Sequence, residues 1–131
     1  MKFVAIRENH LFSKAYSKGK KCVCPSVAVY VLPDYSAKRL AKAHPLGLTV
    51  NRIGLTVSKK VGGAVVRSRT KRILREGLRS LEKNSSLKKG FLIVIAARER
   101  ARGLKSTDIE KELETAFARL GMFAGRQERE K

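Results

Sequence analysis

The feature that most constrains this chain is a dense run of basic residues with the periodicity of a helix. It spans residues 58–76, reads SKKVGGAVVRSRTKRILRE, and places five basic residues between positions 67 and 75. Like charges this close together on one helix repel each other and favour unfolding. A polyanion that neutralises them removes that cost, and the phosphate backbone of a nucleic acid is the obvious candidate.

Apolar residues in the same segment predict a helix over 64–83 with one face on a core. The predicted core stripe consists of Val66, Thr70, Ile73, Leu74, Gly77 and Leu81. At roughly 100° per residue, the opposite side carries Ser68, Arg72, Arg75 and Arg79, and the flanks carry Arg67, Arg69 and Lys71. Residues 59–83 contain nine basic and two acidic residues, an imbalance that favours a phosphate-binding face over an ordinary solvated one.

Composition limits the alternatives. The chain has 131 residues, a net charge of +19 and 43% hydrophobic residues, which indicates one folded basic domain rather than a disordered basic tail. No run approaches the ~20 apolar residues of a membrane span. The first residues lack the apolar stretch of a secretory signal. Cys22 and Cys24 make neither a disulfide framework nor a zinc site, so we expect a cytoplasmic protein without a membrane partner.

The remaining elements follow from periodicity and turn residues. We expect a short helix over 10–18, capped by Asn9 and ended by Gly19, and strands over 26–32, 52–57 and 91–97. Residues 22–24 extend the first strand or form a neighbouring strand across Pro25. Thr107 and Glu110 predict a capping box that starts a last amphipathic helix. Residues 33–50 read as a long basic connection and 121–131 as a flexible tail.

These elements predict the fold class. The order α-β-β-β-α-β-α indicates a single-domain α/β sandwich over residues 1–120, with a sheet of about four strands and three helices. The 52–57 strand, the basic helix and the 91–97 strand form a β-α-β unit, most simply a parallel one. Such crossovers are right-handed in about 98% of cases, and this is what the sequence alone predicts here.

The residue types that carry enzyme chemistry are scattered. His10 and His44 are isolated, and a general acid–base role needs a positioned partner. The acidic residues form no cluster that resembles a two-metal nuclease site, and those at 108–114 suit the N-terminal end of the last helix. The Gly62–Gly63 pair lacks the rest of a nucleotide-binding loop and reads as a tight turn.

Three aromatic residues are candidates for contacts with unpaired bases. Phe12 and Tyr16 are four residues apart on the first helix, and Tyr30 points away from the Val27–Val29–Val31 face of its strand. Aromatic rings on an uncovered sheet face stack with single-stranded bases in several RNA-binding folds. The alternative is that Phe12 packs into the core, which leaves only Tyr16 and Tyr30 available.

The central segment IGLTVSKKVGGAVVRSRTKRILRE, residues 53–76, closely resembles the signature of the bacterial ribonuclease P protein subunit. Supporting features cover most of the chain: the aromatic pair before Gly19–Lys20, the β-rich segment that contains Tyr30, and the apolar strand at 91–97. The resemblance implies a non-catalytic subunit whose RNA partner removes the 5′ leader of precursor transfer RNA with bound Mg²⁺. It also implies a left-handed β-α-β crossover.

The resemblance also assigns roles to residues. It implies that the ribonuclease P RNA subunit is bound by Lys59, Lys60, Arg67, Ser68, Arg69, Lys71, Arg72 and Arg75. It implies that the leader of precursor tRNA is bound by Phe12, Tyr16 and Tyr30, with no catalytic or metal-binding residue on the protein. Ser68 and Gly63 stand where the family usually has Asn, which weakens any metal contact from the protein.

Two other classes of protein fit part of the pattern. A ribosomal or other structural RNA-binding protein would use the same basic helix, and it would fail to stimulate precursor processing by the RNA subunit. A stand-alone metal nuclease would cleave RNA without that subunit, and the absence of a carboxylate cluster in the sequence argues against it.

Overall fold

A five-stranded mixed sheet with the order β1-β4-β5-β3-β2 forms the centre of the protein. The computed structural model describes residues 4–6, 8–43 and 51–123. The strands are β1 (Val4–Ala5), β2 (Lys20–Val23), β3 (Val27–Pro33), β4 (Arg52–Val57) and β5 (Phe91–Ala97). The helices are α1 (Asn9–Lys18), α2 (Ala37–Ala43), α3 (Ala64–Asn84) and α4 (Ser106–Arg119), with a 3₁₀ turn at Glu99–Ala101. The α/β sandwich predicted from the sequence is therefore confirmed.

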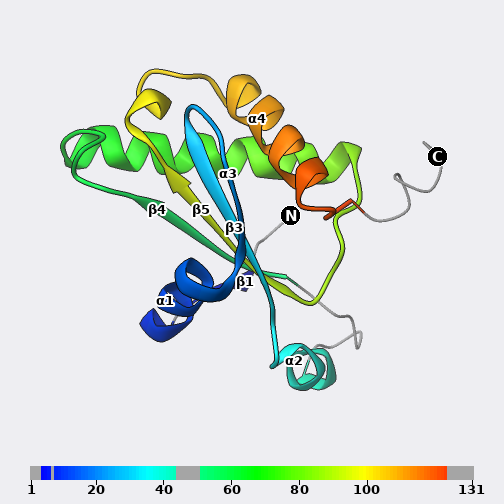
Figure 1. Cartoon of the computed structure of the whole chain (residues 1–131). Helices are drawn as coiled ribbons and strands as arrows, with labels where there is room; N and C mark the ends of the chain where they lie inside the picture. Colours follow the sequence, from blue (N-terminus) through cyan, green and yellow to red (C-terminus); the bar gives the residue numbers. More distant parts are fainter. Residues whose placement is uncertain (1–3, 7, 44–50, 124–131) are drawn as a thin grey trace.

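The β4-α3-β5 unit is parallel, as the sequence predicts, but its crossover has the rare hand. In Figure 1, β4 lies behind β5, and α3 lies above both strands. The chain runs to the left along β4, returns to the right along α3 and runs to the left again along β5. It therefore turns clockwise while it advances toward the viewer, which is a left-handed crossover. The general rule of right-handed crossovers is wrong for this chain, and the family resemblance is right.

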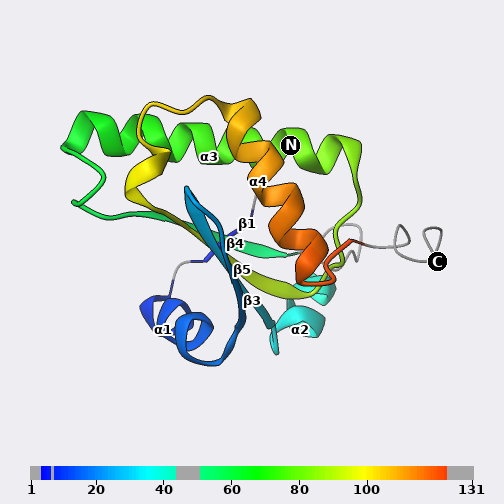
Figure 2. The same cartoon turned by 45° about the horizontal axis from the view of Figure 1, so that its top comes forward.

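The two helices α3 and α4 cover one face of the sheet, and α1 lies against the other (Figures 1 and 2). Valines at alternate positions of β3 share one face, as predicted, and the structure packs this face against α3 and α4. The side chains with no exposed surface under these helices include Val27, Val29, Ile93, Ile95, Leu74, Leu78, Leu113 and Phe117. A smaller cluster on the α1 side consists of Ile6, Leu11, Ala15, Leu32, Leu92 and Val94.

Both predicted helix caps are wrong in detail. The N-cap of α1 is Glu8 rather than Asn9, which is already helical, and no side-chain hydrogen bond closes this end. Helix α4 begins at Ser106, where the Asp108 carboxylate accepts a hydrogen bond from the Lys105 backbone N–H at 3.1 Å. Glu110 is not part of a cap, because its carboxylate accepts a hydrogen bond from Ser80 Oγ at 2.9 Å. Tertiary contact with α3 takes precedence over the local motif.

Three segments add detail that the sequence did not give. The two-residue strand β1 pairs with the start of β4 and brings the sheet to five strands. Residues 20–23 form a hairpin with β3 rather than an extension of it. The 33–50 connection contains α2, and its residues 44–50, including His44, lie outside the described residues. Within the described part of the chain, no helix is long and apolar enough to cross a membrane.

Residues 121–123, which the sequence predicts to be the start of a flexible tail, belong to the folded domain. Gly121 has a φ of 69°, a left-handed conformation that ends α4 and suits glycine. Met122 and Phe123 are then buried, and the backbone N–H of Lys88 donates a hydrogen bond to the Met122 carbonyl at 2.7 Å. The prediction that the tail starts at Gly121 is therefore wrong for residues 121–123, because two large apolar side chains complete the core. Residues 124–131 lie outside the described part.

Candidate RNA-binding surfaces

The basic helix α3 presents most of its predicted RNA-binding side chains to solvent. Lys59 and Lys60 are exposed in the turn before the helix, which buried Val61 anchors. The exposed side chains on the helix itself are Ser68, Arg69, Lys71, Arg72 and Arg75, and Arg67 is half-buried. Within the described residues, no ion pair joins any of these cations to a carboxylate. Their charge is thus available to an external anion.

A small hollow lies between the start of α3 and the end of β4. Its volume is about 230 Å³, and its lining includes Val57, Arg67, Ser68 and Lys71. The Nε atom of Arg67 is buried and has no hydrogen-bond partner among the described residues. A buried N–H without an acceptor is costly, so this donor is suited to a phosphate oxygen or a water in the hollow.

The glycine pair before α3 makes a tight turn, as predicted. A Cβ at Gly62 would lie 2.7 Å from Val66 Cγ1, so a larger residue does not fit there without a shift. Gly63, the N-cap residue of α3, has no atom within 4 Å of such a Cβ. The asparagine that the family resemblance implies at this position would therefore fit. The absence of that amide is a property of this sequence and not a steric requirement.

The three predicted aromatic residues come together at one edge of α1. The rings of Tyr16 and Tyr30 meet edge to face, with centroids 4.8 Å apart and planes at 89°. Tyr16 is 42% exposed, and its hydroxyl lies 3.3 Å from Thr56 Oγ1 on β4. Phe12 and Tyr30 are half-buried against the smaller core cluster. Tyr16 is thus the ring most available for stacking, and Phe12 belongs partly to the core.

The sheet next to these rings carries small side chains. Strand pairing places Gly54 in one row with Val94 and Tyr30, and Thr56 in the next row with Ala96 and Ala28. A Cβ on Gly54 would collide with the ring of Phe12. The absence of a side chain at Gly54 therefore makes room for the Phe12 ring. In the row of Ala28, Ala96 and Thr56, Thr56 contacts the Tyr16 hydroxyl.

A buried ion cluster fixes the N-terminal end of α1. Arg52 donates two hydrogen bonds to Asp34, at 2.8 and 2.9 Å, and its guanidinium lies 3.5 Å from the Glu8 carboxylate. Burial alone raises the pKa of Asp34, but the hydrogen bonds from Arg52 and Ser36 and the charge of Arg52 outweigh it and lower the pKa. The hydrogen bond to Asp34 likewise raises the pKa of Arg52. No local pattern in the sequence predicts this cluster.

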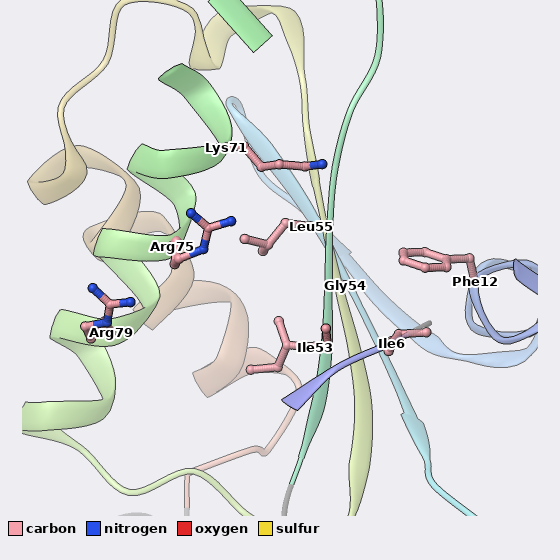
Figure 3. Close-up of a pocket in the computed structure, with 9 residues that line it drawn as sticks. Ile6, Phe12, Ile53, Gly54, Leu55, Lys71, Arg75 and Arg79 are labelled. Atoms are coloured by element: carbon pink, nitrogen blue, oxygen red, sulfur yellow. The ribbon is translucent and has the colours of Figure 1, made fainter. Parts of the chain in front are cut away.

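A larger groove lies along the open edge of β4 (Figure 3). Its volume is about 490 Å³, and it is lined by Ala5, Ile6, Phe12, Ile53, Gly54, Leu55, Lys71, Arg75 and Arg79. Sequence periodicity placed Arg75 and Arg79 on the side of α3 opposite the core, and this is wrong. The core stripe also includes fully buried Leu78, so it is wider than predicted, and the i, i+4 row of Lys71, Arg75 and Arg79 runs along its border toward β4.

Neither cysteine has the properties of a catalytic residue. Burial raises the pKa of Cys24 to about 11, which keeps its thiol protonated and unreactive near neutral pH. Among the described residues, no three His, Cys, Asp or Glu side chains are grouped so that they could hold a metal ion. The candidate surfaces of this domain are thus suited to binding a polyanion with exposed bases.

These surfaces and the fold define a basic α/β RNA-binding domain, and comparisons identify its family. The family model for Ribonuclease P matches residues 1–121. The chain belongs to the ribonuclease P protein family, and its role is in tRNA processing as a ribonuclease P subunit.

Relatives and solved structures agree with this family. The ribonuclease P protein component of Clostridium acetobutylicum is 39% identical over 122 residues, which is 93% of this chain and 92% of that protein. One from Dehalococcoides mccartyi is 50% identical over 70 residues, 53% of this chain and 55% of that protein. The structure of the Staphylococcus aureus RNase P protein superposes with a TM-score of 0.71 at 26% identity, covering 93% of this chain and 99% of that one.

Proposed function

We propose that α3 binds the ribonuclease P RNA subunit, that the aromatic edge of α1 binds the leader of precursor tRNA, and that the RNA subunit carries the chemistry. The observation that supports this most strongly is a set of exposed cations on α3 that form no ion pair with a carboxylate within the described residues, namely Arg69, Lys71, Arg72 and Arg75. A folded helix tolerates such a charge density when a polyanion binds to it. The aromatic pair Tyr16–Tyr30 lies on the other side of the same sheet and contacts β4.

The role of α3 is tested by holoenzyme assembly. Arg69→Ala should weaken the affinity for the RNA subunit and flatten its dependence on salt, because fewer counterions are released. The fold should be retained, since Arg69 is exposed. Lys83→Ala, which also removes an exposed charge, from the last turn of the same helix, is the matched control. Equal affinity and an equal salt slope for Arg69→Ala and wild type would refute the assignment.

The role of the aromatic edge is tested with two RNAs, precursor tRNA and mature tRNA. Tyr16→Ala, Tyr30→Ala and Phe12→Ala should weaken precursor binding by the holoenzyme and leave mature tRNA binding nearly unchanged. Stacking of one base is worth ~1–3 kcal/mol. Tyr35→Ala is the control, because Tyr35 is 79% exposed and contacts Lys14 rather than the other rings. An equal loss for both RNAs would mean that the leader lies elsewhere.

The chemistry is tested with the protein and the RNA subunit separately. We expect no cleavage of precursor tRNA by the protein alone and Mg²⁺-dependent cleavage by the RNA, with Mg²⁺ held mainly by RNA. Ser68 offers one exposed hydroxyl and Gly63 offers no side chain, so these two positions supply no carboxylate or amide oxygen to the metal. Turnover by RNA-free protein that is abolished by Glu76→Gln would overturn this proposal.

A further inference from the structure

The groove along β4 exists because the strand pairing at this edge stops early. Strand β1 pairs only with Arg52 and Ile53, and the N–H of Ile6 donates a final hydrogen bond to the Ile53 carbonyl. Beyond that point, β4 still pairs with β5 on one side, but its other side has no partner strand among the described residues. The chain turns away toward α1, and the space it leaves is the groove between α3 and Phe12 shown in Figure 3.

The charged side chains that line the groove are all basic, and all of them come from α3. Lys71, Arg75 and Arg79 extend from α3 toward β4, and no carboxylate is among the nine lining residues. Apolar side chains from β1 and β4 form the floor, and Phe12 closes the end nearest α1. Cations on one wall and an aromatic ring at the other end suit a single nucleic acid strand, which has a charged backbone and free base faces.

The groove is also continuous with the aromatic edge. Phe12 lines the groove and packs in the same cluster as Tyr30, whose ring contacts Tyr16. We infer that the single-stranded leader passes from the Tyr16–Tyr30 site over the open edge of β4 into this groove, where Lys71, Arg75 and Arg79 bind its phosphates. Lys71 and Arg75 then lie at the boundary between the leader and the RNA subunit. This inference rests on the proposed binding of the leader.

An acidic peptide that adds a strand to β4 would be the other occupant of an open edge. Nothing among the lining residues selects a peptide, whereas the continuity with the aromatic rings favours RNA. A short leader would reach only the aromatic site, and a longer one would also reach the groove. The inference therefore predicts a dependence on leader length that the aromatic site alone does not.

Two pairs of variants test this prediction. Ala5→Glu places a carboxylate in the groove at an exposed position, and its control Val4→Glu alters the neighbouring residue on the opposite face of β1. Arg79→Gln removes a cation from the groove, and its control Lys83→Gln removes one from the next turn of α3. Each holoenzyme is titrated with mature tRNA and with precursors whose leaders have about 3 and about 12 nucleotides, one below and one within the ~4–16-nucleotide site sizes of single-strand-binding domains.

We expect Ala5→Glu and Arg79→Gln to bind the long-leader precursor about fivefold more weakly, as for the loss of one exposed ion pair. The salt slope of Arg79→Gln should fall by about 0.7, the value for one phosphate contact on a single strand. Affinity for the short-leader precursor and both control variants should match wild type. Unfolding in urea and assembly with the RNA subunit are measured for every variant, and Arg79→Gln decides the result if Ala5→Glu unfolds.

Three results would overturn the inference. They are equal losses for both leader lengths, weaker assembly with the RNA subunit in place of weaker leader binding, and no effect of either groove variant. The groove would be assigned to a peptide if neither groove variant changed leader binding while the protein bound a poly-glutamate peptide and Ala5→Glu abolished that binding. A failure of the proposed function itself is distinct, because wild-type holoenzyme would then bind precursors no more tightly than mature tRNA.

Discussion

The two faces of the sheet differ in how completely they are covered. The face under α3 and α4 carries a core in which Leu74, Leu78 and Phe117 have no exposed surface. Within the part of the chain that the structure describes, the other face is covered mainly by the ten residues of α1, and its rings at positions 12, 16 and 30 remain partly exposed. The comparison indicates that one face supplies most of the stability of the domain, and that the other keeps aromatic surface available for a ligand.

The physical reason lies in the side chains of the central strands. Toward α3 and α4, β3 and β5 present valines and isoleucines, which bury a large apolar area and gain roughly 25 cal/mol for each Å². Toward α1, several positions are glycine, alanine or threonine, including Gly54, Ala28 and Ala96. These small side chains reduce the apolar area that α1 can bury, so the ion cluster at its N-terminal end supplements the smaller apolar cluster in holding the helix.

The largest expected effect concerns the well-covered face. Phe117→Ala should lower the free energy of unfolding by about 4 kcal/mol, because it removes a fully buried ring that also contacts Phe123. Leu11→Ala, on the α1 face, should cost about 2 kcal/mol, near the lower end of the range for such substitutions. Urea unfolding measures both, and equal losses would contradict the comparison.

A somewhat smaller effect is expected from the ion cluster that holds α1. Arg52→Met should cost about 3 kcal/mol, because it leaves the Asp34 carboxylate buried without its main partner. The double variant Asp34→Leu with Arg52→Met should recover part of this loss, since it removes the unpaired charge as well. If the single and double variants are equally unstable, the loss comes from packing rather than from the uncompensated charge.

The same cluster predicts a pH dependence with a definite sign. The pKa of Asp34 is lowered in the folded state, so the unfolded state binds more protons as the pH falls. The stabilisation is therefore fully present above the ordinary value of 3.8 and is lost as the pH falls through the lower folded value. For Asp34→Asn, the free energy of unfolding should fall less steeply than for wild type as the pH is lowered. Urea titrations between neutral and acidic pH measure this slope.

Gly54→Ala should affect stability and binding together. Its Cβ collides with the Phe12 ring, so the ring must shift, at a cost of roughly 1–2 kcal/mol. The holoenzyme should also lose part of its preference for precursor over mature tRNA. Gly63→Asn is the matched control, because that position is open and asparagine is a favoured N-cap residue. A stable Gly54→Ala variant would mean that Phe12 is not held against the sheet.

The smallest expected effect on stability concerns Glu82 of α3, one of the two helices on the well-covered face. The Glu82 side chain is 7% exposed, its Oε1 atom has no hydrogen-bond partner among the described residues, and burial raises the pKa of its carboxyl group. The charged form therefore costs stability once the pH rises through the folded pKa, which lies above the ordinary value of 4.5. Glu82→Gln should stabilise the protein by about 1 kcal/mol at pH 7 and by nothing in acid, as measured by thermal unfolding.

Local patterns in the sequence were sufficient to predict the helices and strands that have strong periodicity. The basic helix, the strands at 52–57 and 91–97 and the alternation of valines on β3 all match the structure. The predictions of these elements succeed because periodicity and propensity act over a few residues and do not depend on distant contacts. The grouping of Phe12, Tyr16 and Tyr30 as one candidate site came instead from the family resemblance, and the structure places Tyr16 against Tyr30.

Only the tertiary structure determined how distant segments meet. The left-handed crossover, the short strand β1 and the cluster of Arg52 with Asp34 join residues far apart in the sequence, which no local pattern encodes. The groove beside Arg79 arises in the same way, because its position depends on where β1 stops pairing with β4. The sequence by itself determined the chemistry of each surface, and the packing of strands and helices decided which of those surfaces adjoin.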